Sequence, residues 1–256
     1  MVKQLSKISI IVPTLNQGQF IKETLDSLLI QDYPGLEIIV MDGGSTDNTL
    51  DILKSYGDKL LWKSEKDHGQ TQAINKGIGF ATGEILGFLN SDDILLPGAL
   101  SSVATAFSDS NVSWVSGDYE IIDGQGKPIQ SFVVLYKRFL RLFSSRWLLS
   151  FTNYVVQPST FWRRELFDQI GEFDETLNYV MDYDFWMRAI QKRRPFIIHR
   201  KLSAFRIHQQ SKGGSRYEQQ FSEEIEVLQR YTQNKFMILL HRLSNQLIVQ
   251  IYKKIK

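Results

Sequence analysis

The sequence predicts an α/β protein in which a mostly parallel central sheet is flanked by helices. Residues 8–12 and 37–41 are short, nearly continuous apolar runs, which are typical of strands buried on both faces of a parallel sheet. Between them, the apolar residues of 20–29 recur at helical spacing. With 256 residues and 43% hydrophobic content, the chain can bury the core of a single large domain.

A second unit follows the first. We expect a strand at residues 60–63, a helix at 70–79 and a strand at 85–89. This alternation is typical of parallel sheets, in which ligands bind beyond the carboxyl ends of the strands. The chemistry is therefore expected in the polar loops that follow the strands.

Beyond residue 110 the pattern is less regular. The turn at 123–126 predicts a hairpin between strands at 119–122 and 129–134. Residues 135–151 and 230–256 are basic and amphipathic, and residues 216–256 are expected to form a helical extension. Their apolar stripes are suited to an anionic bilayer, to packing on the domain or to pairing with a second copy as a homodimer, and the sequence does not choose among these.

Composition excludes several kinds of site. The chain has no cysteine, so any metal must be bound by oxygen or imidazole. Residues 1–134 carry a net charge of −8 and residues 135–256 a net charge of +10. No apolar run is long enough to span a bilayer and no secretion signal opens the sequence, so we expect a cytoplasmic protein, if membrane-associated then at the inner face.

Two adjacent carboxylates, Asp92 and Asp93, follow the fourth predicted strand. Mg²⁺ and Mn²⁺ prefer oxygen ligands and often bind through one or two carboxylates together with substrate phosphates. The pair therefore indicates a metal–diphosphate site, although Asp92 could simply cap the following turn. Asp42 follows the second strand in a glycine-containing loop that lacks the lysine of a phosphate-binding P-loop.

Taken together, these motifs resemble the family-2 inverting glycosyltransferases, which have the GT-A fold. The resemblance covers residues 8 to about 210 and rests on matched segments in order, at residues 9–17, 37–49, 67–77, 87–93, 157–167, 171–175 and 181–188. It implies a GT-A-like domain over residues 1–215, with a nucleotide-sugar-binding half at 1–110 and an acceptor-binding half at 111–215.

The resemblance also implies site residues. Residues that would bind the nucleotide-sugar donor, commonly a UDP-sugar, are Pro13, Thr14, Asn16, Asp42, Gln70, Lys76 and Asp92. Residues that would bind a divalent metal, Mn²⁺ or Mg²⁺, are Asp93, as the stronger candidate, and His208. Such an ion would neutralise charge on the departing diphosphate.

Asp182 matches the family's catalytic base, which takes the proton of the acceptor hydroxyl in a single inverting displacement. The residue before the base is often Glu in the family and is Met181 here, which leaves the acceptor less defined than the reaction. Asp182 could also serve only as a favourable charge at a helix N-terminus. Three residues of this region could either face the acceptor or belong to the core: Trp162, Arg163 and Trp186.

The sequence thus predicts transfer of a sugar to a hydroxyl of a glycan or lipid-linked acceptor, in the assembly of cell-envelope polysaccharide or glycolipid. A sugar nucleotidyltransferase is the alternative enzyme, but residues 13–18 lack the basic residues that would hold a triphosphate. A catalytically silent binding module is the second alternative, although both Asp93 and Asp182 are retained. Nucleic acid is not expected as a partner, because the loops at the strand ends are acidic.

Overall fold

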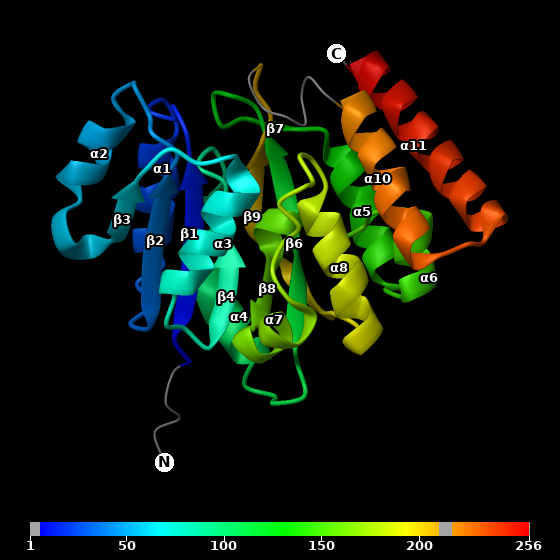
Figure 1. The fold of residues 1–256 in the computed structure, drawn as a ribbon, viewed down its shortest axis with the longest axis horizontal. Helices are drawn as coiled ribbons and strands as arrows, with labels where there is room; N and C mark the ends of the chain where they lie inside the picture. Colours follow the sequence, from blue (N-terminus) through cyan, green and yellow to red (C-terminus); the bar gives the residue numbers. More distant parts are fainter. Residues whose placement is uncertain (1–5, 210–216, 256) are drawn as a thin grey trace.

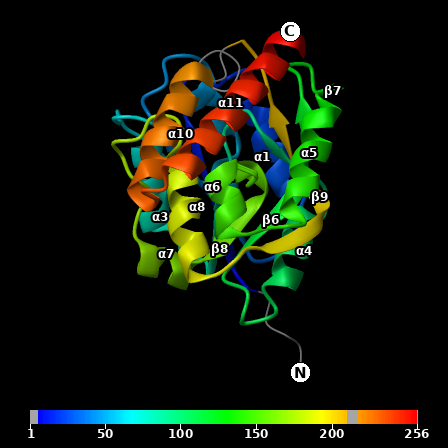
Figure 2. The same cartoon turned by 90° about the vertical axis from the view of Figure 1, so that its right-hand side faces the viewer.

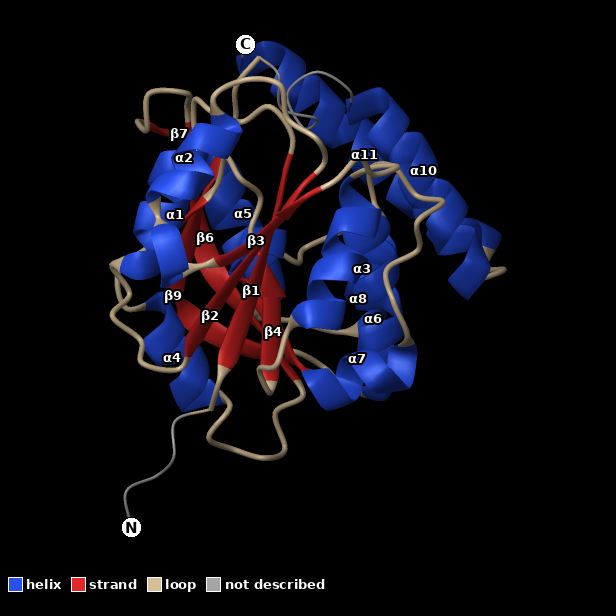
Figure 3. Ribbon diagram, turned by 60° about the vertical axis from the view of Figure 1, so that its left-hand side comes forward, coloured by secondary structure: helices blue, strands red, loops and turns tan. Residues whose placement is uncertain are grey.

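A computed structural model describes residues 6–209 and 217–255, and shows one central sheet with helices on both faces (Figures 1 and 3). In the described part of the chain the sheet has nine strands, in the order β3-β2-β1-β4-β8-β6-β9-β5, with β7 paired to β6. The α/β architecture predicted from the sequence is therefore confirmed.

The first half of the chain builds the parallel part of the sheet. Its strands are β1 (Ile8–Thr14), β2 (Leu36–Asp42), β3 (Leu61–Ser64) and β4 (Ile85–Phe88), all paired in parallel. They lie where the apolar runs predicted them. The helices between and after them are α1 (Ile21–Leu29), α2 (Thr49–Ser55), α3 (Gln70–Phe80) and α4 (Ala99–Ala106), with a 3-10 turn η1 (Gly57–Lys59) before β3.

The apolar runs are continuous because both faces of these strands are covered. Ile10 and Val12 of β1 pack in one cluster with α1 and α4, whereas Ile11 packs in a second cluster with α3. The α3 helix approaches the sheet closely, since a Cβ atom added at Gly77 would lie 2.6 Å from a side-chain carbon of Ile11. Alternate side chains therefore enter two separate cores.

The second half of the sheet is mixed. It contains β5 (Ile94–Leu95), β6 (Trp114–Ile122), β7 (Pro128–Ile129), β8 (Thr160–Arg163) and β9 (Phe196–Arg206). The predicted hairpin is present as β6 and β7, which pair in antiparallel fashion. Its second strand is shorter than predicted: Gln130 adopts a left-handed conformation with φ of 51°, and residues 131–134 begin a helix.

Helices of the second half of the chain pack around this part of the sheet (Figure 2). They are α5 (Ser131–Arg141), α6 (Arg146–Phe151), α7 (Arg164–Ile170), α8 (Met181–Lys192), α10 (Tyr217–Tyr231) and α11 (Lys235–Ile255), with a 3-10 turn η2 (Gln157–Ser159) before β8. The expected C-terminal extension is helical. It packs on the domain, because α10 contacts α8 and α11 contacts α6.

Trp162 and Trp186 belong to the core and do not face a ligand. Both are fully buried, and the ring of Trp186 stacks on that of Trp114 at 5.5 Å between centroids. The guanidinium of Arg163 donates hydrogen bonds to the backbone carbonyls of Phe107 and Val112. The acceptor-facing role considered for Trp162 and Trp186 is therefore wrong, because β8 and α8 place both inside the packed layers, whereas Arg163 is half-buried and is held by these backbone carbonyls.

In the part of the chain that the structure describes, no helix has the length and apolar character needed to cross a lipid bilayer.

Candidate active site

The loops after β1 and β2 are joined by hydrogen bonds that place the predicted donor-binding residues side by side. Thr14 and Asp42 are register partners at the ends of these two strands. The backbone N–H of Thr46 donates to Oδ1 of Asn16 at 2.8 Å, and the N–H of Asn16 donates to Oγ of Ser45 at 2.7 Å. Asn16 has a positive φ of 52°, a conformation that asparagine tolerates better than most residues. The two loops are therefore held together at the carboxyl ends of β1 and β2.

The carboxylate of Asp42 is buried and stabilises these two loops by accepting hydrogen bonds. It accepts hydrogen bonds from the N–H groups of Gly44 at 3.1 Å and Ser45 at 3.0 Å, and from the hydroxyl of Ser64 at 2.6 Å. These contacts hold the loop in shape. The expected contact of Asp42 with a nucleotide base stays a prediction.

The other predicted donor-binding residues surround the same edge. Pro13 and Thr14 are buried, and the hydroxyl of Thr14 has no hydrogen-bond partner among the described residues. Gln70 begins α3 and donates to Oδ1 of Asn90 at 2.6 Å. The amine of Lys76 lies 2.6 Å from a carboxylate oxygen of Glu65. Buried polar groups are normally hydrogen-bonded, so the unpaired hydroxyl of Thr14 is an exception in this part of the protein.

The two adjacent carboxylates after β4 point in different directions. Oδ2 of Asp92 lies 3.0 Å from Nε2 of His208, and both side chains are partly exposed. The Asp93 side chain is completely buried, where it accepts hydrogen bonds from the backbone N–H of Arg206 at 2.8 Å and from the amide of Asn90 at 3.2 Å. Burial, together with the neighbouring Asp92, raises the pKa of Asp93 well above its usual value.

A divalent cation would fit Asp92 and His208 better than Asp93. The carboxylate and the imidazole face each other at the protein surface and offer the oxygen and nitrogen ligands that such an ion accepts. Among the described residues no cluster of three or more acidic or histidine side chains forms a protein-only metal site. Diphosphate oxygens would therefore have to complete the coordination, and the stronger role predicted for Asp93 stays a prediction that its burial does not favour.

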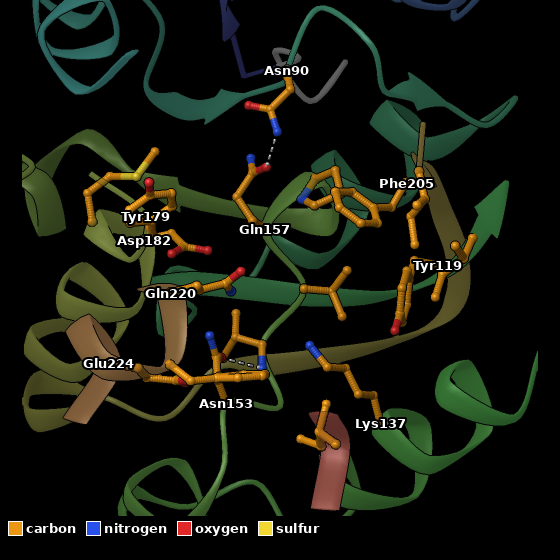
Figure 4. Close-up of a pocket in the computed structure, with 18 of the residues that line it drawn as sticks. Asn90, Tyr119, Lys137, Asn153, Gln157, Tyr179, Asp182, Phe205, Gln220 and Glu224 are labelled. Atoms are coloured by element: carbon orange, nitrogen blue, oxygen red, sulfur yellow. Dashed lines mark hydrogen bonds between the residues drawn. The ribbon is translucent and has the colours of Figure 1, made fainter. Parts of the chain in front are cut away.

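A cavity of about 280 Å³ extends from the polar loops at the carboxyl ends of the strands, which we call the donor edge, to the predicted base Asp182 (Figure 4). Gln70 and Asn90 line it from the strand-end loops, and Asp182 lines it from the first turn of α8. The amide of Asn90 donates to Oε1 of Gln157 at 3.3 Å, and the amide of Gln157 donates to the carbonyl of Phe88 at 2.8 Å. Gln70, Asn90 and Asp182 therefore line one and the same cavity.

The electrostatics of Asp182 suit a base. Burial raises its pKa to about 6, and the nearby carboxylate of Glu224 acts in the same direction. Two groups oppose the rise: the backbone N–H of Tyr183, which donates to Oδ1 at 2.8 Å, and the amine of Lys137. Asp182 is thus a stronger base than an exposed aspartate, yet it is ionised at neutral pH.

Sequence reasoning missed the side chains that close the cavity around Asp182. Lys137 comes from α5, Gln157 from η2, and Gln220 and Glu224 from α10 (Figure 4). Gln157 lay inside a segment that carried the resemblance, which was a usable signal. Lys137 and Glu224 lay in segments interpreted only as amphipathic helices, and nothing in their spacing indicated a site.

Glu224 is held by the last helix. It is buried, accepts a hydrogen bond from the amide of Asn245 at 3.2 Å and lies 3.6 Å from Nε2 of His241. His241 is also fully buried, and its Nδ1 lies 2.8 Å from the carbonyl of Ser150. The C-terminal helices are therefore part of the cavity wall.

Known proteins resemble this chain in sequence. The model of Glycosyl transferase family 2 matches residues 9–171. An uncharacterised glycosyltransferase of Rickettsia typhi is 32% identical over 210 residues, which cover 78% of this chain and 64% of the relative. A glycosyltransferase of PGL/p-HBAD biosynthesis from Mycobacterium bovis is 31% identical over 192 residues, which cover 71% of this chain and 68% of that protein.

Solved structures share the fold. S. aureus TarS 1–349 in complex with UDP-GlcNAc has a TM-score of 0.65 at 25% identity, over 87% of this chain and 65% of that one. The mannosyltransferase PcManGT of Pyrobaculum calidifontis, in complex with GDP-Man and Mn²⁺, has a TM-score of 0.65 at 19% identity, over 94% of this chain and 74% of that one. The match to the first relative spans under two thirds of that relative's length. The fold is of the GT-A type, and the chain belongs to glycosyl transferase family 2.

Proposed function

We propose that this protein transfers a sugar from a nucleoside-diphosphate sugar, with UDP as the nucleotide, to a hydroxyl group of a glycan or glycolipid acceptor. The observation that carries the proposal is the shared cavity, which is lined both by Asp182 and by Gln70 and Asn90. Family membership and the UDP-GlcNAc bound to TarS support a nucleotide sugar as donor.

The reaction we propose is a single displacement that inverts the anomeric carbon. The acceptor oxygen forms a bond to C1 while the bond from C1 to the diphosphate oxygen breaks, and its electron pair leaves with the diphosphate. Asp182 accepts the hydroxyl proton, which a carboxylate with a pKa of about 6 can do at neutral pH. The cavity wall formed by Lys137, Gln157 and Glu224 orients the acceptor and excludes bulk water.

Asp92 and His208 would hold a divalent cation against the donor diphosphate. When bound, that ion would supply Lewis-acid stabilisation of the charge on the leaving group. The Mn²⁺ bound by PcManGT supports the choice of metal. Lys76, which already carries an ion pair to Glu65, would then lie near the nucleotide as the resemblance implies.

The direct test is donor turnover. Purified protein with Mn²⁺ is offered uridine-, guanosine- and thymidine-diphosphate sugars, and released nucleoside diphosphate is measured with and without chelator. We expect slow hydrolysis of one uridine donor that the chelator abolishes. The Asp182→Asn variant should still bind UDP by calorimetry but lose turnover. If no donor is turned over and UDP does not bind, the proposal fails.

A further inference from the structure

Two helices of this protein are turned so that their apolar side faces outward. In an ordinary surface helix the apolar stripe packs on the core and the polar side meets water. In α11 the buried positions are polar, namely His241, Ser244 and Asn245. Its large apolar side chains are exposed, and they recur three or four residues apart on one face: Phe236, Leu239, Leu243 and Leu247.

The α5 helix is reversed in part. Its inner side carries the buried apolar residues Val133 and Leu140, but also Arg141, which is fully buried and forms an ion pair with Asp118, and Lys137, which reaches the cavity. The outer side of α5, the turn after it and the first turn of α6 carry exposed apolar side chains: Phe132, Leu135, Phe139, Leu142, Phe143 and Trp147. We call these six residues, together with the four exposed apolar residues of α11, the outer apolar face.

The outer apolar face is unusually large for a surface in contact with water. The side chain of Phe139 is 59% exposed and that of Trp147 is 70% exposed. With roughly 150–250 Å² for each aromatic side chain, the five aromatic residues of the face alone expose on the order of 600 Å², and its five leucines add to this. The largest apolar patch of a typical monomer is about 300–600 Å², so this face is expected to be covered by another apolar phase. Figure 2 shows α5, α6 and α11 on the same side of the molecule.

The charges of these helices indicate what covers the outer apolar face. Residues 131–151 and 227–256 contain no aspartate or glutamate. Exposed cations lie on the same helices as the apolar residues: Arg146, Lys235 and Arg242, and also Arg138, which already pairs with Asp118. In a two-fold dimer built through this face, these cations would meet the same helices of the partner, which offer no acidic side chain to pair with them. Anionic lipid head groups provide both the charge and the apolar layer that the face needs.

We propose that the outer apolar face docks onto the surface of an anionic lipid bilayer, with α5 and α11 lying in the plane of the interface. The inner side of the same helices lines the cavity, through Lys137 of α5 and Asn245 and Ile248 of α11. Docking therefore sets the cavity beside the lipid surface. If the proposed transfer to glycolipids is right, the acceptor is reached from that surface.

Vesicle flotation of the full chain tests this proposal without any need for a donor or acceptor. We expect binding to vesicles of phosphatidylcholine with about one third phosphatidylglycerol, and much weaker binding to phosphatidylcholine alone or at high salt. Bound protein should also show quenching of Trp147 fluorescence by brominated lipid, because the tryptophans at 114, 162 and 186 are buried in the core and the partly buried Trp62 lies on β3, at the far end of the strand order.

Matched variants distinguish binding through the outer apolar face from nonspecific adsorption to vesicles. Phe139→Ser combined with Leu243→Ser should lower vesicle binding by about ten-fold or more, since two large apolar contacts are lost. Reversing the charge of Lys235 and Arg242 to Glu should abolish the preference for anionic lipid. The control is Ile30→Ser, at the end of α1, where an equally exposed apolar side chain lies outside the face and its loss should leave binding unchanged.

Two outcomes overturn the proposal. One is that the protein does not bind vesicles and light scattering shows a dimer that Phe139→Ser dissociates. The outer apolar face is then covered by a second copy of the chain. If the protein ignores vesicles and is monomeric, the face has no lipid partner. Because flotation does not depend on catalysis, either result leaves the proposed sugar transfer to be judged by donor turnover alone.

Discussion

Oδ2 of Asp92 lies 3.0 Å from Nε2 of His208, although 116 residues separate them in the sequence. The contact forms because His208 follows β9, whose partner strand β5 begins two residues after Asp92. If this pair holds the metal, Asp92→Ala and His208→Ala should each weaken Mn²⁺-dependent UDP binding by about ten-fold or more, as losses around metal sites usually do. Titration calorimetry with UDP, with and without Mn²⁺, measures the effect.

Asp93 should behave differently from its neighbour. The Asp93→Ala variant leaves the N–H of Arg206 and the amide of Asn90 without their buried acceptor, which costs about 1–3 kcal/mol of stability. Thermal unfolding should show a lower Tm for Asp93→Ala and an unchanged Tm for Asp92→Ala. If Asp93→Ala keeps its Tm but loses metal binding, the roles of the two carboxylates are reversed.

The pH dependence of transfer should report Asp182. The base acts only when ionised and its pKa is about 6, so kcat/KM should fall about ten-fold per pH unit below 6 and level off above 7. Glu224→Gln removes a negative charge that raises this pKa, so the acid limb should move to lower pH. The control is Glu226→Gln, an exposed carboxylate on the same helix, which should leave the profile in place. An unshifted profile for Glu224→Gln would show that the two carboxylates are not coupled.

Glu223 ties the C-terminal helices to the start of α8. Its carboxylate accepts hydrogen bonds from three consecutive N–H groups, those of Asn178 at 2.8 Å, Tyr179 at 2.6 Å and Val180 at 3.0 Å. Hydrogen bonds to a charged group contribute about 1.5–3 kcal/mol each, so Glu223→Ala should lower stability by several kcal/mol at most and lower kcat more than it raises KM. Chemical denaturation and steady-state kinetics would measure both, with Glu226→Ala as the control.

The buried ion pair of Arg141 with Asp118 should dominate the stability of α5. Asp118→Ala leaves a fully buried guanidinium without its partner, which is expected to cost about 3–5 kcal/mol. On the same strand, Glu120 forms an exposed pair with Lys201 at 2.9 Å, and Glu120→Ala should cost at most about 1 kcal/mol. Similar urea midpoints for the two variants would contradict this assignment.

The parallel half of the fold could be predicted because its signals are local. Strands β1 and β2 are covered on both faces and therefore appear in the sequence as apolar runs. Topology alone brings the loops that follow them to the carboxyl ends of the strands, whereas the roles expected of Gln70 and Asp182 came from the resemblance.

What could not be predicted depends on distant contacts. Whether Asp92 or Asp93 faces solvent is decided by the backbone of Arg206, more than 100 residues later. Helical spacing predicted the stripes of α5 and α11 but not which side turns inward. That choice is set by buried partners such as Asp118 for Arg141 and the carbonyl of Ser150 for His241.

The cavity wall is built from two parts of the chain, one inside the segment that the family model matches and one after it. The family match ends at residue 171, before Asp182 and before every residue of α10 and α11. Gln70 and Asn90 lie inside the matched segment, whereas Gln220, Glu224 and Asn245 lie after it. Exchanging residues 217–255 between relatives should therefore change the acceptor while the donor stays the same.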